Sequence, residues 1–339
     1  MSTPVSAPNQ TQTKHDGANK PDKKGSPGRN SLPNQPGPRP QQVLRGALFF
    51  LSAIFLFSAL DATAKYLSLV FAVPLLVWAR YLVHLLLMLP TVLPVMGRTL
   101  LQTKHPLLML IRTLVLVGVT LLGQLAMQKL PLAETTALIF VAPLLVALLA
   151  GPMLGEKPSG AMWLSTCAGL IGVLLIVRPG GNLMGGNNAD IGIGVLYALG
   201  AALCYAVYQM LTRKLSSSEP PMRLLFHSAL FGALGMSCIL PFYWQTWHLQ
   251  MLNTEVVLLI ISLGVYGAVG HFLMIRAFSD APASSLSPLL YVQLIWATLL
   301  GFWIFKQLPD LWALLGMTII GLSGINVVLR SKKSTLPPE

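Results

Sequence analysis

Residues 130–157 read LPLAETTALIFVAPLLVALLAGPMLGEK, a long apolar run that begins at a proline turn and ends in a charged turn. A helix needs about 20 predominantly apolar residues to cross the hydrocarbon core of a bilayer, which is about 30 Å thick. This stretch has the length and composition of one membrane-spanning helix. Blocks of the same kind recur along the chain, so the pattern predicts a membrane protein built of helices.

The composition supports the same fold class. Of 339 residues, 54% are hydrophobic and only 10% are charged, and the mean hydropathy is +0.67, whereas a soluble protein is about 25% charged. The formal net charge of +12 does not indicate a nucleic-acid partner, because most basic residues lie in the tails and between apolar blocks, where they orient the spans. We therefore predict an all-α polytopic membrane protein that sits in a lipid bilayer.

Polar breaks between the apolar blocks define the spans. They predict ten transmembrane helices, at about residues 45–67, 72–93, 106–128, 132–153, 159–178, 191–212, 222–243, 255–275, 282–304 and 311–330. An even number of spans puts both termini on one side of the membrane. The loops on that side then hold most of the Lys and Arg between spans, as expected for the cytoplasm.

The two ends of the chain are expected to lie outside the membrane. Residues 1–44 are rich in Pro, Gln, Asn, Lys and Gly and contain no long apolar run. Such a segment cannot bury enough apolar surface to offset its chain entropy, so we predict a disordered basic cytoplasmic tail and no cleavable signal peptide. Residues 331–339 are expected to form a second cytoplasmic tail.

The two halves of the chain repeat one pattern. GQLAMQKL at 123–130 and GHFLMIRAF at 270–278 match in Gly, Met and a basic residue at an offset of 147 residues. GEKP at 155–158 and KQLP at 306–309 each precede a helix with regularly spaced glycines, GLIGVLL and GLSGINV. We therefore expect the chain to contain two related halves.

Each half has an odd number of spans. Residues 45–178 hold five, a Gly- and Asn-rich linker occupies 179–190, and residues 191–330 hold five more. Because five is odd, the second half enters the membrane from the opposite side. The sequence thus predicts two inverted-topology five-helix repeats, a construction in which many secondary transporters bind substrate near the membrane midplane.

The opening stretch and GLIGVLLIVRPG at 169–180 resemble the EamA type of the drug/metabolite transporter superfamily. The resemblance covers nearly all of residues 45–330. It implies a secondary transporter of the bacterial inner membrane that holds no cofactor. In the second half, Gln307 stands where the family usually has Glu. DATAKYL at 61–67, followed by WARYLV at 78–83, is similar to members that move riboflavin, S-adenosylmethionine or related metabolites.

Two charges lie inside the first apolar block. Asp61 and Lys65 are four residues apart, so on a helix they share a face, with the acid N-terminal to the base as in a favourable ion pair. A charge at the centre of a lipid-spanning helix costs roughly 2.5–3.5 kcal/mol on insertion scales. Two interpretations stay open. Either Lys65 snorkels to the outer interface and Asp61 only pairs with it, or Asp61 faces a water-filled vestibule and binds a cation, a proton or part of the substrate.

Other polar residues are expected near the depth of Asp61, in the outer half of the membrane. Arg80 keeps its charge, so it either contacts Asp61 or offers its donors to an anionic or carbonyl group of a substrate. His84 lies one turn deeper, as a helix contact or a proton relay. Gln124 and Glu134 reach the same level, although Glu134 also suits the first turn of its helix, where an acid complements the helix dipole.

The second half of the chain contains counterparts of these residues. The positions that match the polar residues of spans one to three are Gln209, His227 and His271, and inverted topology places them toward the inner side. The second half therefore has polar side chains at these positions but no counterpart of the charges of Asp61 and Arg80. Four more side chains are expected near the centre, as substrate contacts or as packing residues: Tyr205, Tyr291, Gln293 and Trp296.

Several further residues have a structural interpretation. Arg112 lies one turn into the third span, near the cytoplasm, and is expected to snorkel. Pro143 and Pro288 are expected to kink spans four and nine, because proline removes a backbone hydrogen bond. The three cysteines lie in separate apolar blocks without CxxC spacing, which disfavours a disulfide or a metal site.

These observations favour a secondary active transporter of small organic metabolites that works by alternating access, coupled to protons or working by exchange. Asp61 is the first candidate for the coupling group and Glu134 the second. An exporter of drugs, excess metabolites or amino acids with the same fold is the alternative. An enzyme or a scaffold has less support, because the sequence holds no nucleophile–base spacing and its interior polar residues do not suit a scaffold. Substrate, direction and oligomeric state, a homodimer included, are left open.

Overall fold

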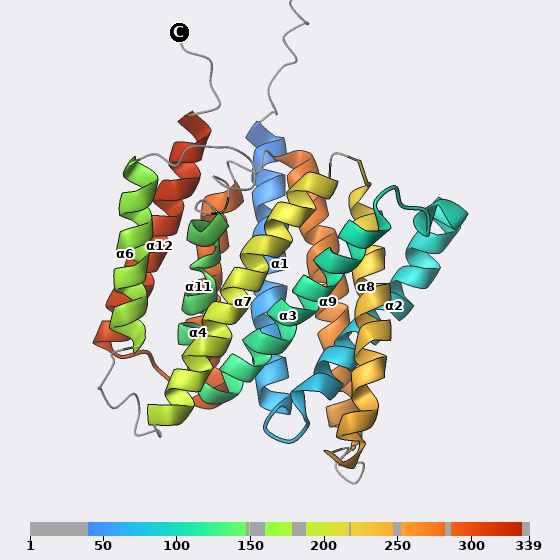
Figure 1. Ribbon diagram of the computed structural model, residues 1–339, viewed down its shortest axis with the longest axis horizontal. Helices are drawn as coiled ribbons and strands as arrows, with labels where there is room; N and C mark the ends of the chain where they lie inside the picture. The colour runs from blue at the N-terminus through green and yellow to red at the C-terminus, as the bar shows by residue number, and fades with distance from the viewer. Residues whose placement is uncertain are drawn as a thin grey trace, which may run out of the picture. The chain divides into compact units, whose positions relative to one another are not determined.

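The computed structural model describes residues 40–146, 149, 160–177, 188–216, 218–246, 252–281 and 286–333. All regular secondary structure in these segments is helical. The segments belong to one compact unit, Pro38–Glu339, and Figure 1 shows them as a bundle of helices. The predicted all-α class is therefore confirmed for the described part of the chain.

The described helices follow one another along the chain. They are α1 (Pro40–Leu67), α2 (Val73–Met96), the short 3-10 helix η1 (Gly97–Leu100), α3 (Pro106–Lys129), α4 (Leu132–Ile139), α6 (Gly160–Val177), α7 (Asn188–Leu215), α8 (Pro221–Ile239), η2 (Leu240–Thr246), α9 (Thr254–Asp280), η4 (Ser287–Tyr291), α11 (Val292–Phe305) and α12 (Leu311–Lys333).

Six of the described helical segments are long and apolar enough to cross a membrane, by length and composition. They are Gln41–Leu67, Val73–Leu100, Pro106–Lys129, Asp190–Leu215, Pro221–Tyr243 and Thr254–Asp280. Shorter apolar helices occupy Leu132–Val146, Cys167–Ile176, Leu289–Phe305 and Leu311–Ser323. The chain is therefore a multi-pass helical membrane protein.

Three helices extend into segments that were predicted to be tail or linker. α1 begins at Pro40, so residues 40–44 are helical, and α7 begins at Asn188, inside the predicted linker. α12 continues to Lys333, past the predicted start of the second tail. Hydropathy marks where a helix meets lipid, whereas a helix ends where its backbone hydrogen bonds end, so helices extend beyond the apolar runs. Parts of the predicted tails, linker and spans lie outside the described residues, at 1–39, 147–148, 150–153, 159, 178–187, 282–285 and 334–339.

Local sequence explains where several helices begin. Proline occupies the first turn of α2, α3 and α8, where its missing N–H costs no helical hydrogen bond and its fixed φ suits the helix. The Asn253 side chain caps α9 by accepting a hydrogen bond from the Val256 backbone N–H at 2.8 Å. These signals set the positions at which the chain re-enters the bundle.

The predicted breaks at Pro143 and Pro288 are confirmed. α4 ends at Ile139, and Phe140 and Val141 form a turn before the helix resumes around Pro143. Pro288 lies in η4, immediately ahead of α11. Proline lacks a backbone N–H donor and clashes with the preceding turn, so a regular helix is interrupted at both places.

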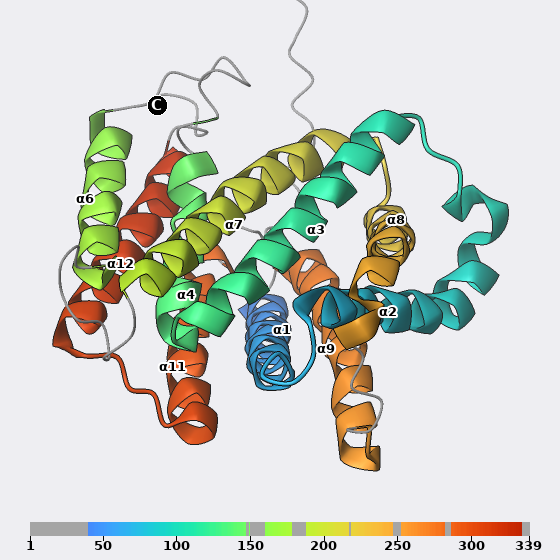
Figure 2. The same ribbon diagram turned by 60° about the horizontal axis from the view of Figure 1, so that its bottom comes forward.

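The helices pair early parts of the chain with late ones. α3 lies along α7, α1 along α9, and α6 along α12, and the pairs stay side by side in both views (Figures 1 and 2). α2 packs against α8 and α9, and α3 also packs against α8. α11 contacts both α1 and α4, and α4 contacts α7. Contacts between distant segments thus hold the bundle together.

Two glycines let α6 and α12 approach closely. A Cβ added at Gly172 of α6 would lie 2.8 Å from the carbonyl oxygen of Gly316 of α12. A Cβ added at Gly316 would lie 2.5 Å from the carbonyl oxygen of Gly172. Small facing residues allow backbone contact between membrane helices, where packing replaces the hydrophobic effect as the driving force.

A buried acid ties two loops together at one end of the bundle. Glu219, between α7 and α8, accepts hydrogen bonds from the Thr103 hydroxyl at 2.7 Å, the Lys104 backbone N–H at 2.9 Å and the Arg223 guanidinium at 2.6 Å. Burial of the carboxyl raises its pKa, but the three hydrogen bonds together outweigh burial, so the pKa of Glu219 lies below its usual value. The loop before α3 is thereby fixed to the start of α8.

We expect Glu219→Gln to lower the melting temperature of the purified protein at pH 7, because hydrogen bonds to a charged group contribute about 1.5–3 kcal/mol. A carboxyl with a depressed folded-state pKa stabilises the protein above its unfolded-state pKa, and that stabilisation is lost as the pH falls through the folded-state value. The difference in melting temperature should therefore be full at pH 7 and shrink below about pH 4. Glu255→Gln, at an exposed acid in the first turn of α9, is the control. Equal losses from the two variants at pH 7 would contradict this role for Glu219.

Candidate functional site

Asp61 of α1 and Arg80 of α2 interact electrostatically inside the bundle. Both side chains are half-buried. Within the described segments, neither one forms a hydrogen bond or a salt bridge shorter than 4.0 Å. An ionised group inside a membrane protein has to meet protein, water or a ligand. Asp61 and Arg80 therefore keep acceptors and donors available to water or to a solute.

Lys65 does not form the predicted ion pair with Asp61. Its Nζ donates a hydrogen bond to the Leu130 carbonyl oxygen at 2.6 Å, and its electrostatic partner is Glu134. It is 6% exposed, so it does not snorkel to water. Leu130 ends α3 in front of Pro131, and its carbonyl lacks a helical partner. Lys65 thus fastens α1 to the α3–α4 corner.

His84 of α2 and His271 of α9 lie against each other. Their rings stack with centroids 5.9 Å apart. Gly267 leaves room beside them, because a Cβ added there would lie 3.7 Å from Arg80 Nε and 3.9 Å from His84 Nδ1. α9 packs on both α1 and α2 and so brings His271, a residue of the second half, to His84 of the first half. We call Asp61, Arg80, His84 and His271 the polar centre.

Gln124 and Glu134, the other members of the predicted outer cluster with Asp61 and Arg80, are both buried. Glu134 is 2% exposed in the first turn of α4 and interacts electrostatically with Lys65. Gln124 of α3 is 4% exposed, and neither atom of its amide has a hydrogen-bond partner in the described part of the chain. A buried unpaired amide costs about 1–3 kcal/mol, so Gln124 remains a candidate contact for water or solute.

Arg112 is an interior residue whose role sequence reasoning missed. It is 1% exposed, so the prediction that it snorkels is wrong. Its guanidinium donates to Thr212 Oγ1 at 2.7 Å, Leu224 O at 3.1 Å, Ser228 Oγ at 2.6 Å and Tyr208 OH at 2.8 Å. It also lies 4.6 Å from the centroid of the Tyr208 ring. Arg112 therefore joins α3 to α7 and α8.

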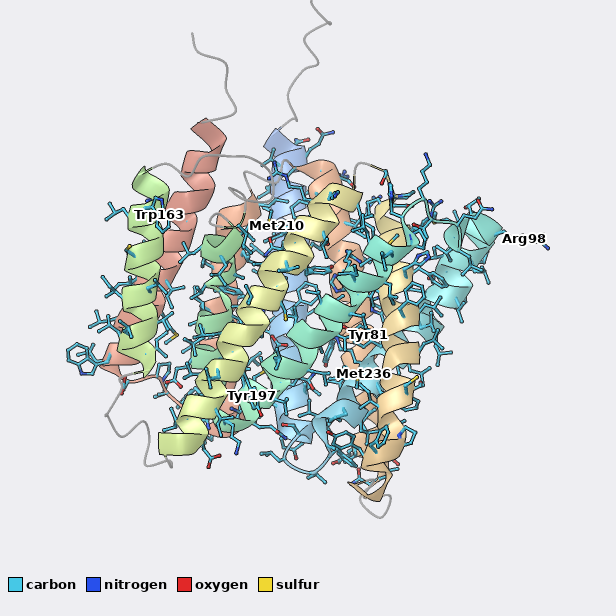
Figure 3. All side chains as sticks on the ribbon, viewed as in Figure 1. Tyr81, Arg98, Trp163, Tyr197, Met210 and Met236 are labelled. Atoms are coloured by element: carbon cyan, nitrogen blue, oxygen red, sulfur yellow. The ribbon has the colours of Figure 1, made fainter. Side chains whose placement is uncertain are left out.

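Packing, and not sequence spacing, decides the environment of Arg112. Hydropathy places it near a membrane boundary, while its acceptors on α7 and α8 lie far away in the chain and meet it only because α3 packs on both helices. Figure 3 shows the contrast with Arg98, which points outward at the edge of the bundle. Tyr81, also labelled there, lies inside and shares a hydrogen bond with Thr120 of α3 at 3.1 Å.

The remaining second-half candidates, Tyr205, Gln209 and His227, lie on α7 and α8. The Tyr205 ring stacks on Tyr208 with centroids 6.1 Å apart, and Gln209 is half-buried on the same helix. His227 is 3% exposed, and its Nδ1 lies 2.9 Å from the Arg223 carbonyl oxygen one turn earlier. These contacts are those of helix packing, so a role for the three residues in binding remains a prediction.

Tyr291, Gln293 and Trp296 lie in η4 and α11. Tyr291 packs edge-on against Phe140 with centroids 5.6 Å apart, and Trp296 against Phe55 at 4.9 Å. Gln293 is 8% exposed. The Tyr291 hydroxyl and the Trp296 indole N–H have no hydrogen-bond partner among the described residues. Packing accounts for the two rings, whereas substrate contact by these residues remains a prediction.

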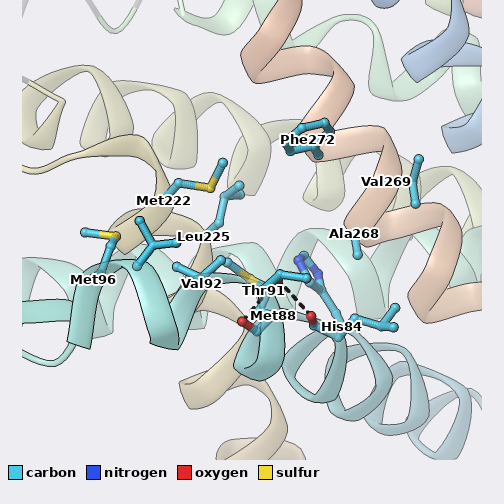
Figure 4. A pocket seen from close by; sticks show the side chains of 12 residues that line it. His84, Met88, Thr91, Val92, Met96, Met222, Leu225, Ala268, Val269 and Phe272 are labelled. Atoms are coloured by element: carbon cyan, nitrogen blue, oxygen red, sulfur yellow. Dashed lines mark hydrogen bonds between the residues drawn. The ribbon is translucent and has the colours of Figure 1, made fainter. Parts of the chain in front are cut away.

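A cavity of about 580 Å³ lies between α2, α8 and α9. We call it the α2–α8–α9 cavity. Small-molecule sites commonly measure about 300–1,000 Å³. His84 belongs both to this cavity and to the polar centre, and Figure 4 shows its ring projecting beside Thr91 and Ala268. His84 is 6% exposed, and its Nε2 has no hydrogen-bond partner in the described segments.

The polar centre has the groups needed to bind a polar solute. No group of three or more His, Cys, Asp or Glu side chains that would hold a metal ion occurs in the described ranges. The polar centre combines a carboxylate, a guanidinium and two imidazoles, which can bind a polar solute and take up or release a proton. Membrane-length helices that enclose unpaired polar groups and a cavity are typical of a membrane transport protein.

The protein belongs to the EamA-like transporter family, which its sequence matches over residues 44–178 and 192–329. It is 26% identical over 291 residues to the S-adenosylmethionine uptake transporter of Rickettsia prowazekii (strain Madrid E), covering 86% of this chain and 95% of that one. It is 30% identical over 287 residues to the riboflavin transporter of Vibrio cholerae serotype O1 (strain ATCC 39315 / El Tor Inaba N16961). That match covers 83% of this chain and 91% of the relative.

The fold also resembles a solved structure. A crystal structure aligns with 85% of this chain and 98% of its own chain, with a TM-score of 0.59 and 19% sequence identity. Likeness at this level of identity shows the fold alone. The predicted resemblance to EamA-type transporters is thus confirmed by the family match and by relatives that cover most of the chain.

We expect Arg112→Lys to lower the melting temperature of the purified protein, because one ammonium cannot reach four acceptors on two helices. Buried acceptors left unpaired cost about 1–3 kcal/mol each. Arg98→Lys is the matched control, since Arg98 is exposed and a surface substitution changes stability by about 0.5 kcal/mol or less. Equal melting temperatures of the two variants would contradict the role of Arg112 in joining α3 to α7 and α8.

Proposed function

We propose that the protein is a secondary active transporter that carries small organic metabolites across the bacterial inner membrane by alternating access. The observation that carries the proposal is the polar centre. Asp61 and Arg80 are half-buried in a membrane-spanning bundle and make no direct hydrogen bond or salt bridge to the described residues. Ionisable residues inside a membrane protein mark substrate or ion pathways. Membership of the EamA-like transporter family supports the same function.

Asp61 is the proposed proton-coupling group, and Arg80 is its counter-charge. While Asp61 is ionised, it compensates the guanidinium of Arg80. When Asp61 takes up a proton, that compensation is lost, and Arg80 then favours an acceptor or anionic group of the solute. Proton and solute therefore bind together and leave together. Exchange of one solute for another is the second mode that such a site supports.

Two inverted five-helix repeats are the proposed topology, with both termini in the cytoplasm. The family matches each half of the chain separately. In the proposed repeats, α7, α9 and α11 are the counterparts of α1, α3 and α4. Helix pairing supports the inversion, because α1 packs on α9 and α11, and α7 packs on their counterparts α3 and α4. The pairs α2–α8, α6–α12 and α4–α11 each join one helix to its own counterpart. Exchanging the two halves leaves this pattern unchanged, as a two-fold relation requires.

The relatives supply the first solutes to test. One is named for uptake of S-adenosylmethionine and another for riboflavin. Both solutes are organic metabolites of a size that a cavity of about 580 Å³ can hold at least in part. We therefore propose a metabolite of this general size as the substrate and use these two compounds as initial probes.

Direction separates this proposal from its alternative, an exporter of drugs or excess metabolites. The name of the Rickettsia relative supports import. The methionine-rich lining of the α2–α8–α9 cavity favours the exporter, because methionine adapts to ligands of different shapes. Counterflow in proteoliposomes loaded on one side at a time distinguishes the two directions.

We expect Asp61→Asn to abolish concentrative uptake driven by a pH gradient while leaving exchange across the membrane. Asparagine keeps the shape and polarity of the side chain but cannot carry the coupling proton. The measurement is accumulation of labelled riboflavin or S-adenosylmethionine in proteoliposomes, with and without the gradient. Concentrative uptake whose pH dependence matches that of the unmodified protein would rule out Asp61 as the coupling group.

Two further variants complete this experiment. Glu255→Gln removes an exposed acid at the start of α9 and should leave both uptake and exchange unchanged. Glu134→Gln tests the second coupling candidate, which interacts with Lys65. If Glu134→Gln alone loses gradient-driven uptake, the coupling role moves from Asp61 to Glu134.

The proposed topology predicts which loops face outward. In a background without native cysteines, Lys129→Cys should react with a membrane-impermeant maleimide added to intact cells. Arg98→Cys, in η1 between α2 and α3, should react only after the membrane is permeabilised. Labelling of both positions from the same side would contradict the topology. The native cysteines to be replaced are Cys167, Cys204 and Cys238.

A further inference from the structure

The α2–α8–α9 cavity has a mainly apolar wall. α2 contributes most of it, and α8 and α9 complete it with Met222, Leu225, Ala268, Val269 and Phe272. Thioether and aromatic groups pack well against flat or irregular apolar ligands. A ligand in this cavity therefore needs an apolar body that replaces water along the wall.

His84 is the polar feature that this cavity presents. Its Nε2 is buried and lacks a partner in the described part of the chain. The other described polar side chain on the wall, Thr91, already donates to the Leu87 and Met88 carbonyl oxygens of its own helix, as the dashed lines in Figure 4 mark. An imidazole nitrogen either donates or accepts, so one hydrogen-bonding group of the ligand fits opposite His84.

Charge next to the cavity selects against cations. None of the described residues that line it is acidic. Arg80 interacts electrostatically with His84, and its Nε lies 3.7 Å from the position of a Cβ added at Gly267, on the same side as His84 Nδ1. When Asp61 takes up the proposed coupling proton, it no longer offsets the charge of Arg80, with which it interacts. In a low-dielectric interior, a ligand cation would meet this guanidinium as a like charge.

We infer that the α2–α8–α9 cavity binds the apolar body of an amphipathic solute that is uncharged or anionic, with its hydrogen-bonding group held at His84, and that it rejects cations. Of the two initial probes, riboflavin belongs to this class, whereas S-adenosylmethionine carries a sulfonium cation and should bind more weakly. This inference rests on the proposed function, because it assigns the substrate class of the same transporter. The anionic or acceptor end of the solute faces the polar centre. The apolar end lies along α8 and α9.

Three probes with one shared ring system test the class. Binding of 2-naphthoate, 2-naphthylmethanol and 2-naphthylmethylamine to the full chain in lipid nanodiscs is measured by isothermal titration calorimetry. The acid and the alcohol should bind, and the amine should bind at least about tenfold more weakly, a difference of about 1.4 kcal/mol. Equal affinity for the amine, or no binding of any probe, would overturn the inference.

Variants locate the binding. Ala268→Trp fills the cavity and should weaken binding of the acid and the alcohol by about tenfold or more. Ala268→Leu, a smaller change that serves if the Trp variant does not fold, should weaken it by about threefold. Leu174→Trp, on the exposed face of α6, is the control and should bind as the unmodified protein does. Probe binding that survives both Ala268 substitutions would place the probes in lipid or at another site.

His84→Leu separates recognition from general apolar attraction. Leucine keeps an apolar wall but removes the ring nitrogen, so the preference for the acid and the alcohol over the amine should fall about threefold or more. An unchanged preference would contradict the role of His84. Binding is measured without transport, so these outcomes do not depend on the proposed function. Transport that persists without probe binding would overturn the substrate class alone.

Discussion

A charged group inside a membrane-spanning bundle has to be compensated, and the ways in which this protein meets that constraint define its site. Lys65 is compensated by the Leu130 carbonyl and by Glu134. Arg112 is compensated by hydroxyl and carbonyl acceptors on α7 and α8. Asp61 and Arg80 have only long-range attraction to each other in the described part of the chain. The first two residues therefore hold helices together, and the last two remain available for binding.

The helix packing positions this available pair. α9 lies along α1 and also contacts α2, so it brings His271 to His84 and leaves a small residue, Gly267, beside Arg80. On its other side, α2 packs against α8, and the space between the three helices is the α2–α8–α9 cavity. The polar centre and the α2–α8–α9 cavity thus share one side chain, His84. A solute with a polar end and an apolar body suits such a neighbourhood.

Much of the fold could be predicted from the sequence, because apolar runs of membrane length are a local signal and Pro143 and Pro288 mark breaks by their own geometry. Asp61 and Arg80 could be chosen as site residues for the same reason, since an interior charge stands out in an apolar run. The partners of Lys65 and Arg112 could not be predicted. They lie on helices distant in the chain, and spacing along one helix suggested Asp61 for Lys65 and the interface for Arg112. The contact between His271 and His84 could not be predicted either, because it depends on the packing of α9 against α2.

Counterflow in proteoliposomes tests alternating access at the polar centre most directly. The full chain is reconstituted, the vesicles are loaded with an unlabelled metabolite whose binding raises the melting temperature of the protein, and the labelled metabolite is added outside. Alternating access predicts transient accumulation of label above the level in protein-free vesicles, and its loss in Arg80→Gln. A metabolite that binds the protein yet shows no counterflow, or counterflow that is unchanged in Arg80→Gln, would contradict transport through this site.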